Sequence, residues 1–314
     1  MALPCPRRRP ARMEALCAVG GFLVLTIAFV LAAEVWFPEW YDREYTVRRQ
    51  RLHERIAEAP DRPLLAVIGS SRAGTDISPE CLPPLHDAAG RQVLVFNYSH
   101  YGAGPRMNLV QFRRLLRDGI RPTWLVVELL PAHLRSESNE AILSAVADFP
   151  ALLPYVNRSS FLVEAARIRW DAPYRWRTPF LRTAAPEFAT QAGEGDDVYL
   201  GPFGDDRNFT RPGALSGERR AHQFKVIEQM YAEPMRRFRI DPLLAEAARD
   251  LLRECRDRGI STVLLIGPED RRFRSWYGPG VEDAIRDFYT RLGEEFDVPV
   301  VDARDWSAPE DFLD

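Results

Sequence analysis

The chain has 314 residues, of which 46% are hydrophobic, and a formal net charge of −3 at pH 7. This apolar content, together with seven Trp, predicts a folded core and excludes a largely disordered chain. From Glu34 onward, 44 acidic residues stand against 38 basic ones, a net charge of −6. A nucleic-acid partner is therefore not expected, because phosphate backbones are bound by clustered Lys and Arg.

Residues 15–33 form an uncharged apolar run that is long enough to cross a bilayer. Four arginines precede this run, and acidic residues follow it closely. The positive-inside rule then predicts a cytoplasmic basic tail over residues 1–14 and a single-pass transmembrane anchor over residues 15–33. The main domain would lie outside the cytoplasm, in a periplasm or at the cell surface. A cleavable signal peptide is the alternative, because Leu31-Ala32-Ala33 resembles a cleavage site.

Strands and helices are expected to alternate after a membrane-proximal helical linker at residues 34–61. The expected strands are 64–68, 92–98, 124–130, 262–266 and 298–302, and the expected helices are 45–58, 105–118, 242–258 and 281–292. Pro105 and Pro242 suit the first positions of two of these helices, and Gly119 and Gly259 suit their ends. The alternation predicts an α/β domain over residues 62–314, with a flavodoxin-like, doubly wound parallel sheet.

A long insertion, residues 131–240, interrupts the alternation after the third strand. Apolar stretches at 141–153 and 161–168 predict helices within it, and its position predicts that it covers or shapes a site. Arg and Trp interleave over residues 167–177. This stretch could lie on a membrane or stack on sugars, but packing over the edge of the core is the preferred interpretation.

The four cysteines give no metal-ligand spacing, and no nucleotide-binding motif follows a strand. We therefore expect neither a metal nor a cofactor. Cys81 and Cys255 either form a disulfide or are two buried free thiols.

The apolar strand at 64–68 runs directly into Gly69-Ser70-Ser71. Such a continuous apolar run predicts a strand buried on both faces of a parallel sheet. Gly69 permits a sharp turn, and the serines fall at the carboxyl end of the strand, where open α/β sheets bind ligands. A serine hydroxyl here is a candidate nucleophile if a base lies within reach. The alternative is that Ser70 or Ser71 only caps the next segment.

Three further segments follow strands in an order that is informative. The second strand leads into Asn97-Tyr98-Ser99-His100-Tyr101-Gly102-Ala103-Gly104-Pro105, the third into Glu128-Leu129-Leu130-Pro131, and the sequence closes with Asp311-Phe312-Leu313-Asp314. In order and placement these blocks resemble the SGNH (GDSL-like) hydrolase superfamily. They are most similar to its membrane-anchored extracytoplasmic branch, which includes proteins of alginate O-acetylation and of D-alanine transfer to teichoic acids.

The resemblance implies a role for each matching position. Ser71 would be the nucleophile, its backbone N–H would help to bind the oxyanion, and Gly102, or else Gly104, would supply a second N–H. The supporting residues would be Gly69, Ser70, which replaces the family's aspartate, and Asn97, which opens the second block. Asp314 would orient the general-base histidine.

Two departures from the family pattern affect these expectations. The third block lacks the asparagine of Gly-x-Asn-Asp and has Glu128 and its neighbours instead. The base histidine of Asp-x-x-His would fall three residues after Asp314, so either the chain continues past this point, which is the preferred interpretation, or it has no such base. His100, in the second block, and His133, after the third strand, could also lie near Ser71, but both are expected to have packing or surface roles.

The resemblance thus implies a membrane-anchored extracytoplasmic serine esterase or O-acyltransferase that acts on acyl esters, such as those of a cell-surface polysaccharide. The alternative is a non-catalytic glycan-binding or assembly protein that partners a membrane acyltransferase.

Overall fold

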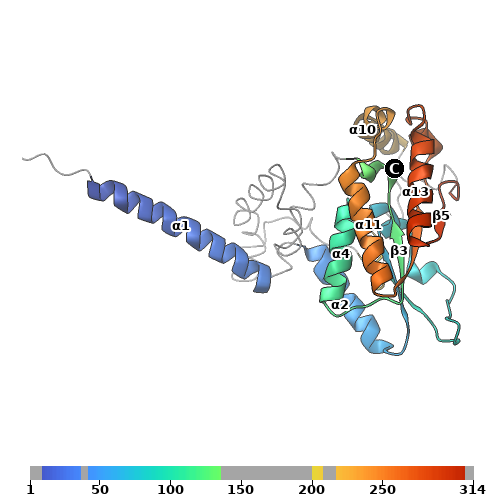
Figure 1. Ribbon diagram of the computed structural model, residues 1–314, viewed down its shortest axis with the longest axis horizontal. Coiled ribbons are helices and arrows are strands. Elements are labelled where there is room, and N and C mark those ends of the chain that lie inside the picture. The colour runs from blue at the N-terminus through green and yellow to red at the C-terminus, as the bar shows by residue number, and fades with distance from the viewer. Residues whose placement is uncertain (1–8, 37–41, 136–199, 208–216, 308–314) are drawn as a thin grey trace, which may run out of the picture. The chain divides into compact units, whose positions relative to one another are not determined.

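A computed structural model describes residues 9–36, 42–135, 200–207 and 217–307, which fall into two units. The first unit contributes helix α1 (Arg9–Trp36), and the second contributes an α/β domain that begins within helix α2 (Arg43–Glu58) (Figure 1). The expected helices at 141–153 and 161–168, the Arg/Trp stretch at 167–177 and Asp314 lie outside the described residues.

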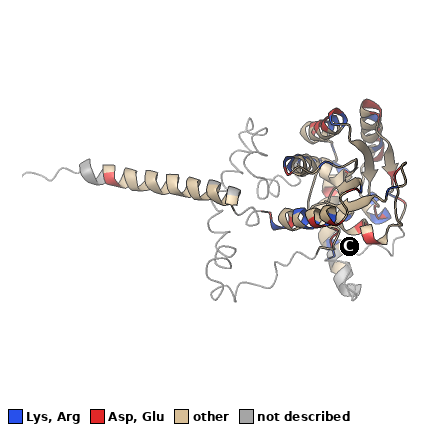
Figure 2. Cartoon of the chain, turned by 90° about the horizontal axis from the view of Figure 1, so that it is seen from below, with Lys and Arg blue, Asp and Glu red and all other residues tan. Residues whose placement is uncertain are grey.

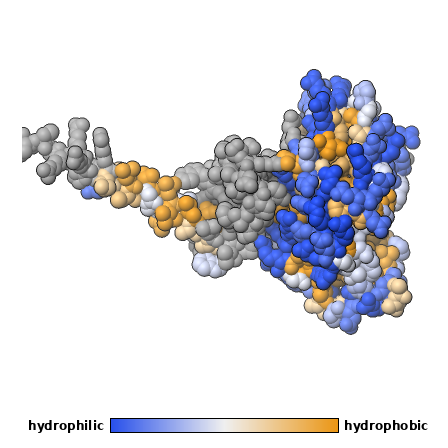
Figure 3. All heavy atoms as spheres, viewed as in Figure 1, coloured by the Kyte–Doolittle hydropathy of each residue, from blue (hydrophilic) through white to orange (hydrophobic). Residues whose placement is uncertain are grey.

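Helix α1 contains the apolar run that the sequence marked as a membrane anchor. Its segment Met13–Val30 has 18 residues and a mean hydropathy of 2.2. The segment is therefore long and apolar enough to cross a membrane. The helix is tan beyond its first turns in Figure 2 and mostly orange in Figure 3, because charged side chains give way to apolar ones. A signal sequence has the same length and composition.

The second unit is built on a five-stranded sheet in which all strands are parallel, with the order β2-β1-β3-β4-β5. The strands are β1 (Leu64–Ile68), β2 (Leu94–Asn97), β3 (Trp124–Glu128), β4 (Ser261–Ile266) and β5 (Val300–Asp302). The parallel α/β class predicted from the sequence is confirmed. Strands β2, β3 and β5 are shorter than predicted.

The helices of this unit after α2 are α3 (Ser71–Asp76), α4 (Pro105–Arg117), α10 (Gly217–Arg236), α11 (Pro242–Asp257), α12 (Arg271–Arg274) and α13 (Val281–Phe296). Short 3₁₀ turns lie at Pro79–Cys81 and Pro131–Leu134. The Asp241 carboxylate caps α11 by accepting a hydrogen bond from the backbone N–H of Leu243 at 2.7 Å. Pro105 and Pro242 occupy the first positions of α4 and α11, as the sequence predicts.

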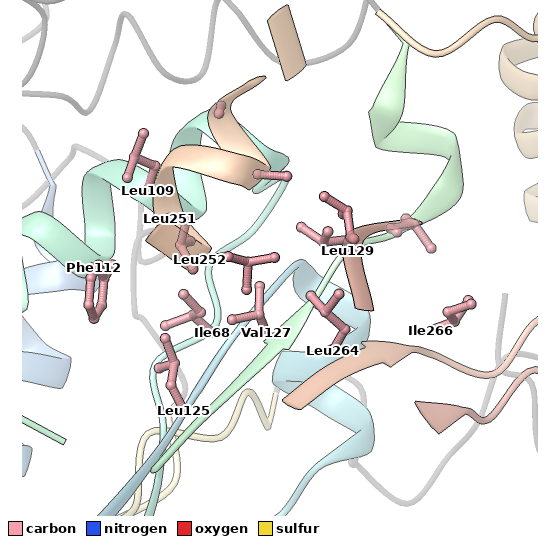
Figure 4. Close-up of a cluster of buried hydrophobic side chains, with 14 of the residues drawn as sticks. Ile68, Leu109, Phe112, Leu125, Val127, Leu129, Leu251, Leu252, Leu264 and Ile266 are labelled. Atoms are coloured by element: carbon pink, nitrogen blue, oxygen red, sulfur yellow. The ribbon is translucent and has the colours of Figure 1, made fainter. Parts of the chain in front are cut away.

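One face of the sheet carries the hydrophobic core (Figure 4). Alternate residues of the strands, such as Ile68, Val127 and Leu264, pack with apolar residues of α4 and α11, including Phe112 and Leu251. Helix α13 joins the same cluster through residues such as Ile285 and Leu292. This period-two pattern fixes which side chains of each strand face these helices.

The opposite face of the sheet is buried in part. Leu65 on β1, Val126 on β3, and Val263 and Leu265 on β4 are half-buried, whereas Val67 on β1 is buried. The expectation that the first strand is buried on both faces therefore holds for β1 except at Leu65.

Residues 200–207, which belong to the expected insertion, lie along the outer edge of β2. The carbonyl oxygen of Phe203 accepts a hydrogen bond from Asn97 N–H at 2.8 Å, and Asp206 N–H donates to Gly74 O on α3 at 2.7 Å. Part of the insertion thus contacts the carboxyl end of the sheet, as expected of a segment that shapes a site. Helix α10, with Pro234 in its last turns, also falls within the expected insertion and was not predicted.

The cysteines do not pair among the described residues. Cys81 is an exposed thiol and Cys255 a buried one. The disulfide alternative is therefore wrong, and the interpretation as two buried thiols holds for Cys255 but not for Cys81.

Candidate functional site

The turn after β1 separates the roles of its two serines. Ser70 is the N-cap of α3, with extended backbone angles (φ −79°, ψ −177°), and its Oγ accepts a hydrogen bond from Arg72 N–H at 3.2 Å. Its side chain is fully buried. The capping interpretation is confirmed for Ser70, which has no route to a substrate.

Ser71 is the first residue of α3 and is partly exposed. Its backbone carbonyl accepts a hydrogen bond from the Thr75 hydroxyl at 2.7 Å. Within the described part of the chain, no side chain is hydrogen-bonded to the Ser71 hydroxyl. Ser71 is thus the serine of this turn whose hydroxyl is available at the carboxyl edge of the sheet.

Residue 69 must be a glycine, because the side chains of Glu128 and Ala73 occupy the space where its Cβ atom would lie. A Cβ atom at this position would lie 2.7 Å from both Cβ and Oε2 of Glu128, and 2.9 Å from Cβ of Ala73. These separations are shorter than van der Waals contact, so the turn can approach β3 only because residue 69 has no side chain.

Glu128, at the end of β3, is a member of the site that the sequence did not identify as one. Its Oε2 accepts a hydrogen bond from Ser70 N–H at 2.7 Å, and its Oε1 accepts one from the Ser70 hydroxyl at 3.3 Å. Complete burial raises the pKa of Glu128 to about 7, although the two bonds from Ser70 and the charge of Arg72 oppose the rise. The carboxylate of Glu128 thus accepts hydrogen bonds from the turn that carries Ser71.

The loop after β2 lies beside the β1 turn. His100 N–H donates to Gly69 O at 2.9 Å, which links the two loops directly. Gly102 follows with a φ of 66°, a left-handed conformation that favours glycine, and Gly104 is the N-cap of α4. Both glycines suggested as N–H donors therefore belong to the loop that adjoins Ser71.

The Asn97 side chain joins helix α3 to the loop after β2 by hydrogen bonds. Its Nδ2 donates to the carbonyl oxygens of Ala73 and Ile77, each at 2.7 Å, and its Oδ1 accepts from Ser99 N–H at 3.0 Å. The side chain is fully buried. Asn97 thus ties α3 to the end of β2.

The two histidines near this edge have partners other than Ser71. His100 Nδ1 lies 3.0 Å from Tyr101 O, and its Nε2 lies 3.3 Å from Oε2 of Glu44. His133 Nδ1 lies 2.8 Å from Ala103 O, and burial lowers the pKa of His133 to about 4. His133 is therefore neutral at pH 7 and joins the β3 loop to the β2 loop, a packing role as predicted.

The loop after β4 completes the edge. Arg72 Nη1 donates to Pro268 O at 3.3 Å, and the guanidinium carbon lies 5.2 Å from the ring centroid of Phe273. Glu269 is buried in this loop and accepts hydrogen bonds from the Tyr277 hydroxyl at 2.8 Å, and burial raises the pKa of Glu269. Arg72 thereby anchors α3, and with it Ser71, to the loop after β4.

These contacts bring Ser71, Gly102 and Gly104 to one edge of the sheet, with Gly69, Ser70 and Asn97 supporting them. No protein-family model matches the chain, and no curated protein matches it. The site thus consists of a partly exposed serine, Ser71, at the start of α3, with the glycine-rich loop after β2 bonded to the same turn at Gly69.

Proposed function

We propose that this chain is a membrane-anchored serine esterase or O-acyltransferase of the SGNH type, with Ser71 as its nucleophile and its main domain outside the cytoplasm. The observation that carries the proposal is the partly exposed Ser71, set on a turn that is held by Gly69, Ser70 and Glu128 at the carboxyl edge of the sheet. The strand order 2-1-3-4-5 is that of flavodoxin-like sheets, which bind ligands at this edge. The apolar helix α1 supports the anchor.

In the proposed reaction, Ser71 Oγ attacks the carbonyl carbon of an acyl ester, and the carbonyl electron pair moves to oxygen. Backbone N–H groups of Ser71 and Gly102, or Gly104, stabilise this oxyanion, and one such donor typically contributes about 10²–10³ in rate. Collapse of the intermediate expels the alcohol, which takes the proton lost by Ser71. Water or a glycan hydroxyl then accepts the acyl group from the serine ester.

The proton in this scheme must pass through a general base. Among the described residues, none is hydrogen-bonded to the Ser71 hydroxyl, and Asp314, which the resemblance pairs with the base, lies outside them. That no described residue is hydrogen-bonded to the Ser71 hydroxyl favours a second candidate function, a non-catalytic protein that binds a glycan or partners a membrane acyltransferase through the same fold.

A fluorophosphonate probe separates the two functions. The full chain in its native membrane should be labelled, as Ser71 Oγ forms a bond to phosphorus and fluoride leaves. Ser71→Ala should abolish the labelling, whereas Ser275→Ala, at an exposed serine whose hydroxyl donates to Arg272 O, should leave it unchanged. A folded full chain that takes up no label would favour the non-catalytic function.

A further inference from the structure

Glu128 is a buried carboxylate at the end of β3, and its hydrogen bonds are made to the turn after β1. It is fully buried, and both of its carboxylate oxygens accept hydrogen bonds from one residue, Ser70, through the backbone N–H and the hydroxyl. A buried carboxylate is costly unless such bonds compensate it. The position therefore calls for an explanation that packing alone does not give.

We propose that Glu128 is a positioning residue whose ionised carboxylate holds the Gly69–Ser71 turn, and thereby fixes the hydroxyl and backbone N–H of Ser71 for reaction. The proposal rests on the proposed function for what Ser71 does, but its structural part does not. Ser70 is bonded to Glu128 on one side and caps α3 through Arg72 N–H on the other. Any movement of the carboxylate is therefore passed to the first residue of α3, which is Ser71.

The surroundings leave the carboxylate little freedom to move. The turn presses on it at Gly69, where even a Cβ atom would not fit. On the far side, a Cβ atom at Gly267 would lie 3.6 Å from Oε1, which is ordinary contact. The backbone carbonyl of Glu128 accepts a hydrogen bond from Asn108 Nδ2 of α4 at 2.9 Å. The tight fit at Gly69 and the two bonds from Ser70 therefore fix the carboxylate on the side of the turn, whereas the space beside Gly267 would admit a methyl group.

The ionisation of Glu128 decides how strongly it holds the turn. An ionised carboxylate accepts both bonds from Ser70, and charge-assisted bonds are about twice as strong as neutral ones. A protonated carboxyl would instead donate to the Ser70 hydroxyl, which already accepts from Arg72 N–H. Of the titratable groups that interact with Glu128, Arg72 of α3 favours the ionised form, whereas Asp76 of α3 opposes it and Tyr289 of α13 lies within electrostatic reach.

Glu128→Gln provides the test, because an amide reproduces the shape and the hydrogen-bond pattern of the protonated carboxyl. The rate of fluorophosphonate labelling of the full chain is measured for both proteins at pH 8 and pH 5.5, and the two rates are compared as a ratio. Any histidine base is common to both proteins and cancels from this ratio. We expect wild type to react about tenfold faster at pH 8, and less than twofold faster at pH 5.5, where its own carboxyl is protonated.

Glu254→Gln is the matched control. The Glu254 carboxylate of α11 accepts a hydrogen bond from Arg113 Nε at 2.7 Å and, among the described residues, has no bond to the β1 turn. Its ratio to wild type should not change between the two pH values. A Glu128→Gln ratio that is constant with pH, or a rate equal to that of wild type at pH 8, would overturn the proposal.

Amide hydrogen exchange keeps the test independent of the proposed function. The peptide that spans residues 65–75 of the full chain is compared under denaturant-free conditions, where it exchanges by local opening of the turn while Glu128 stays buried, and not by unfolding of the domain. It should then exchange more slowly in wild type than in Glu128→Gln at pH 8, by about tenfold at Ser70 N–H, and at nearly equal rates at pH 5.5. If labelling fails in every protein but exchange behaves in this way, Glu128 holds the turn and the proposed chemistry is wrong. If exchange is identical at both pH values, the proposal about Glu128 is wrong whatever Ser71 does.

Discussion

Gly69→Ala tests the packing of the candidate site most severely. The added methyl group would lie 2.7 Å from Cβ and Oε2 of Glu128 and 2.9 Å from Cβ of Ala73. Overpacking of this kind costs about 1–3 kcal/mol. If relief comes from displacing the Glu128 carboxylate, its hydrogen bonds from Ser70 weaken as well, and a bond to a charged group contributes about 1.5–3 kcal/mol. We therefore expect unfolding free energy to fall by about 3–5 kcal/mol.

Urea denaturation of the full chain in detergent, followed by Trp fluorescence, measures this loss. Gly267→Ala is the matched control, because its Cβ atom would approach the same carboxylate from the other side at an ordinary 3.6 Å. This variant should stay within about 0.5 kcal/mol of wild type. Equal effects of the two substitutions, or no effect of Gly69→Ala, would refute the account of how the turn fits over β3.

Three further predictions concern other parts of the α/β domain. Gly204→Ala should lower the unfolding free energy measured in urea by about 3 kcal/mol or more, because φ is 85° and the methyl group would collide with a backbone carbonyl of β2. Gly90→Ala, where φ is 77° but the surrounding space is open, should lower it by only about 1–2 kcal/mol. Similar losses for the two variants would contradict this account of Gly204. Burial raises the pKa of Glu128 from 4.5 to about 7, so its proton stabilises the folded state at low pH and this contribution is lost as the pH rises through 7. Relative to Glu128→Gln, wild type should therefore lose about 2 kcal/mol of unfolding free energy between pH 5.5 and 8, and parallel pH profiles would refute the assignment. Maleimide should label Cys81 in the native chain but Cys255 only after unfolding, because burial raises the pKa of the Cys255 thiol to about 12; native labelling of Cys255, shown by peptide mapping, would contradict its burial.

The elements that the sequence predicted well are those with strong local signals. The apolar run at 64–68 became β1, and the proline and glycine signals at the ends of α4 and α11 were correct within a residue or two. Such signals depend on the backbone geometry of a few neighbouring residues and on the spacing of apolar residues along one helix. Both can be read from a short stretch of sequence. Helix α3 has six residues and no apolar stripe, so periodicity could not reveal it.

The sequence could not reveal the part played by Glu128. The two residues that meet there, Ser70 and Glu128, are 58 positions apart, and only the pairing of β1 with β3 brings them together. The resemblance to the SGNH pattern indicated only that the block from Glu128 to Pro131 has no asparagine, and it gave Glu128 itself no role. The position of Glu128 at the end of an apolar strand, three residues before Pro131, was the available signal, but it did not indicate a partner.

The most direct test of the central claim is to locate the fluorophosphonate adduct by mass spectrometry of peptides from the full chain labelled in its native membrane. The account predicts one adduct, on Ser71, with Ser70 unmodified because its hydroxyl is buried against Glu128. An adduct on another serine, or none on a chain shown to be folded, would contradict the claim that Ser71 is a nucleophile.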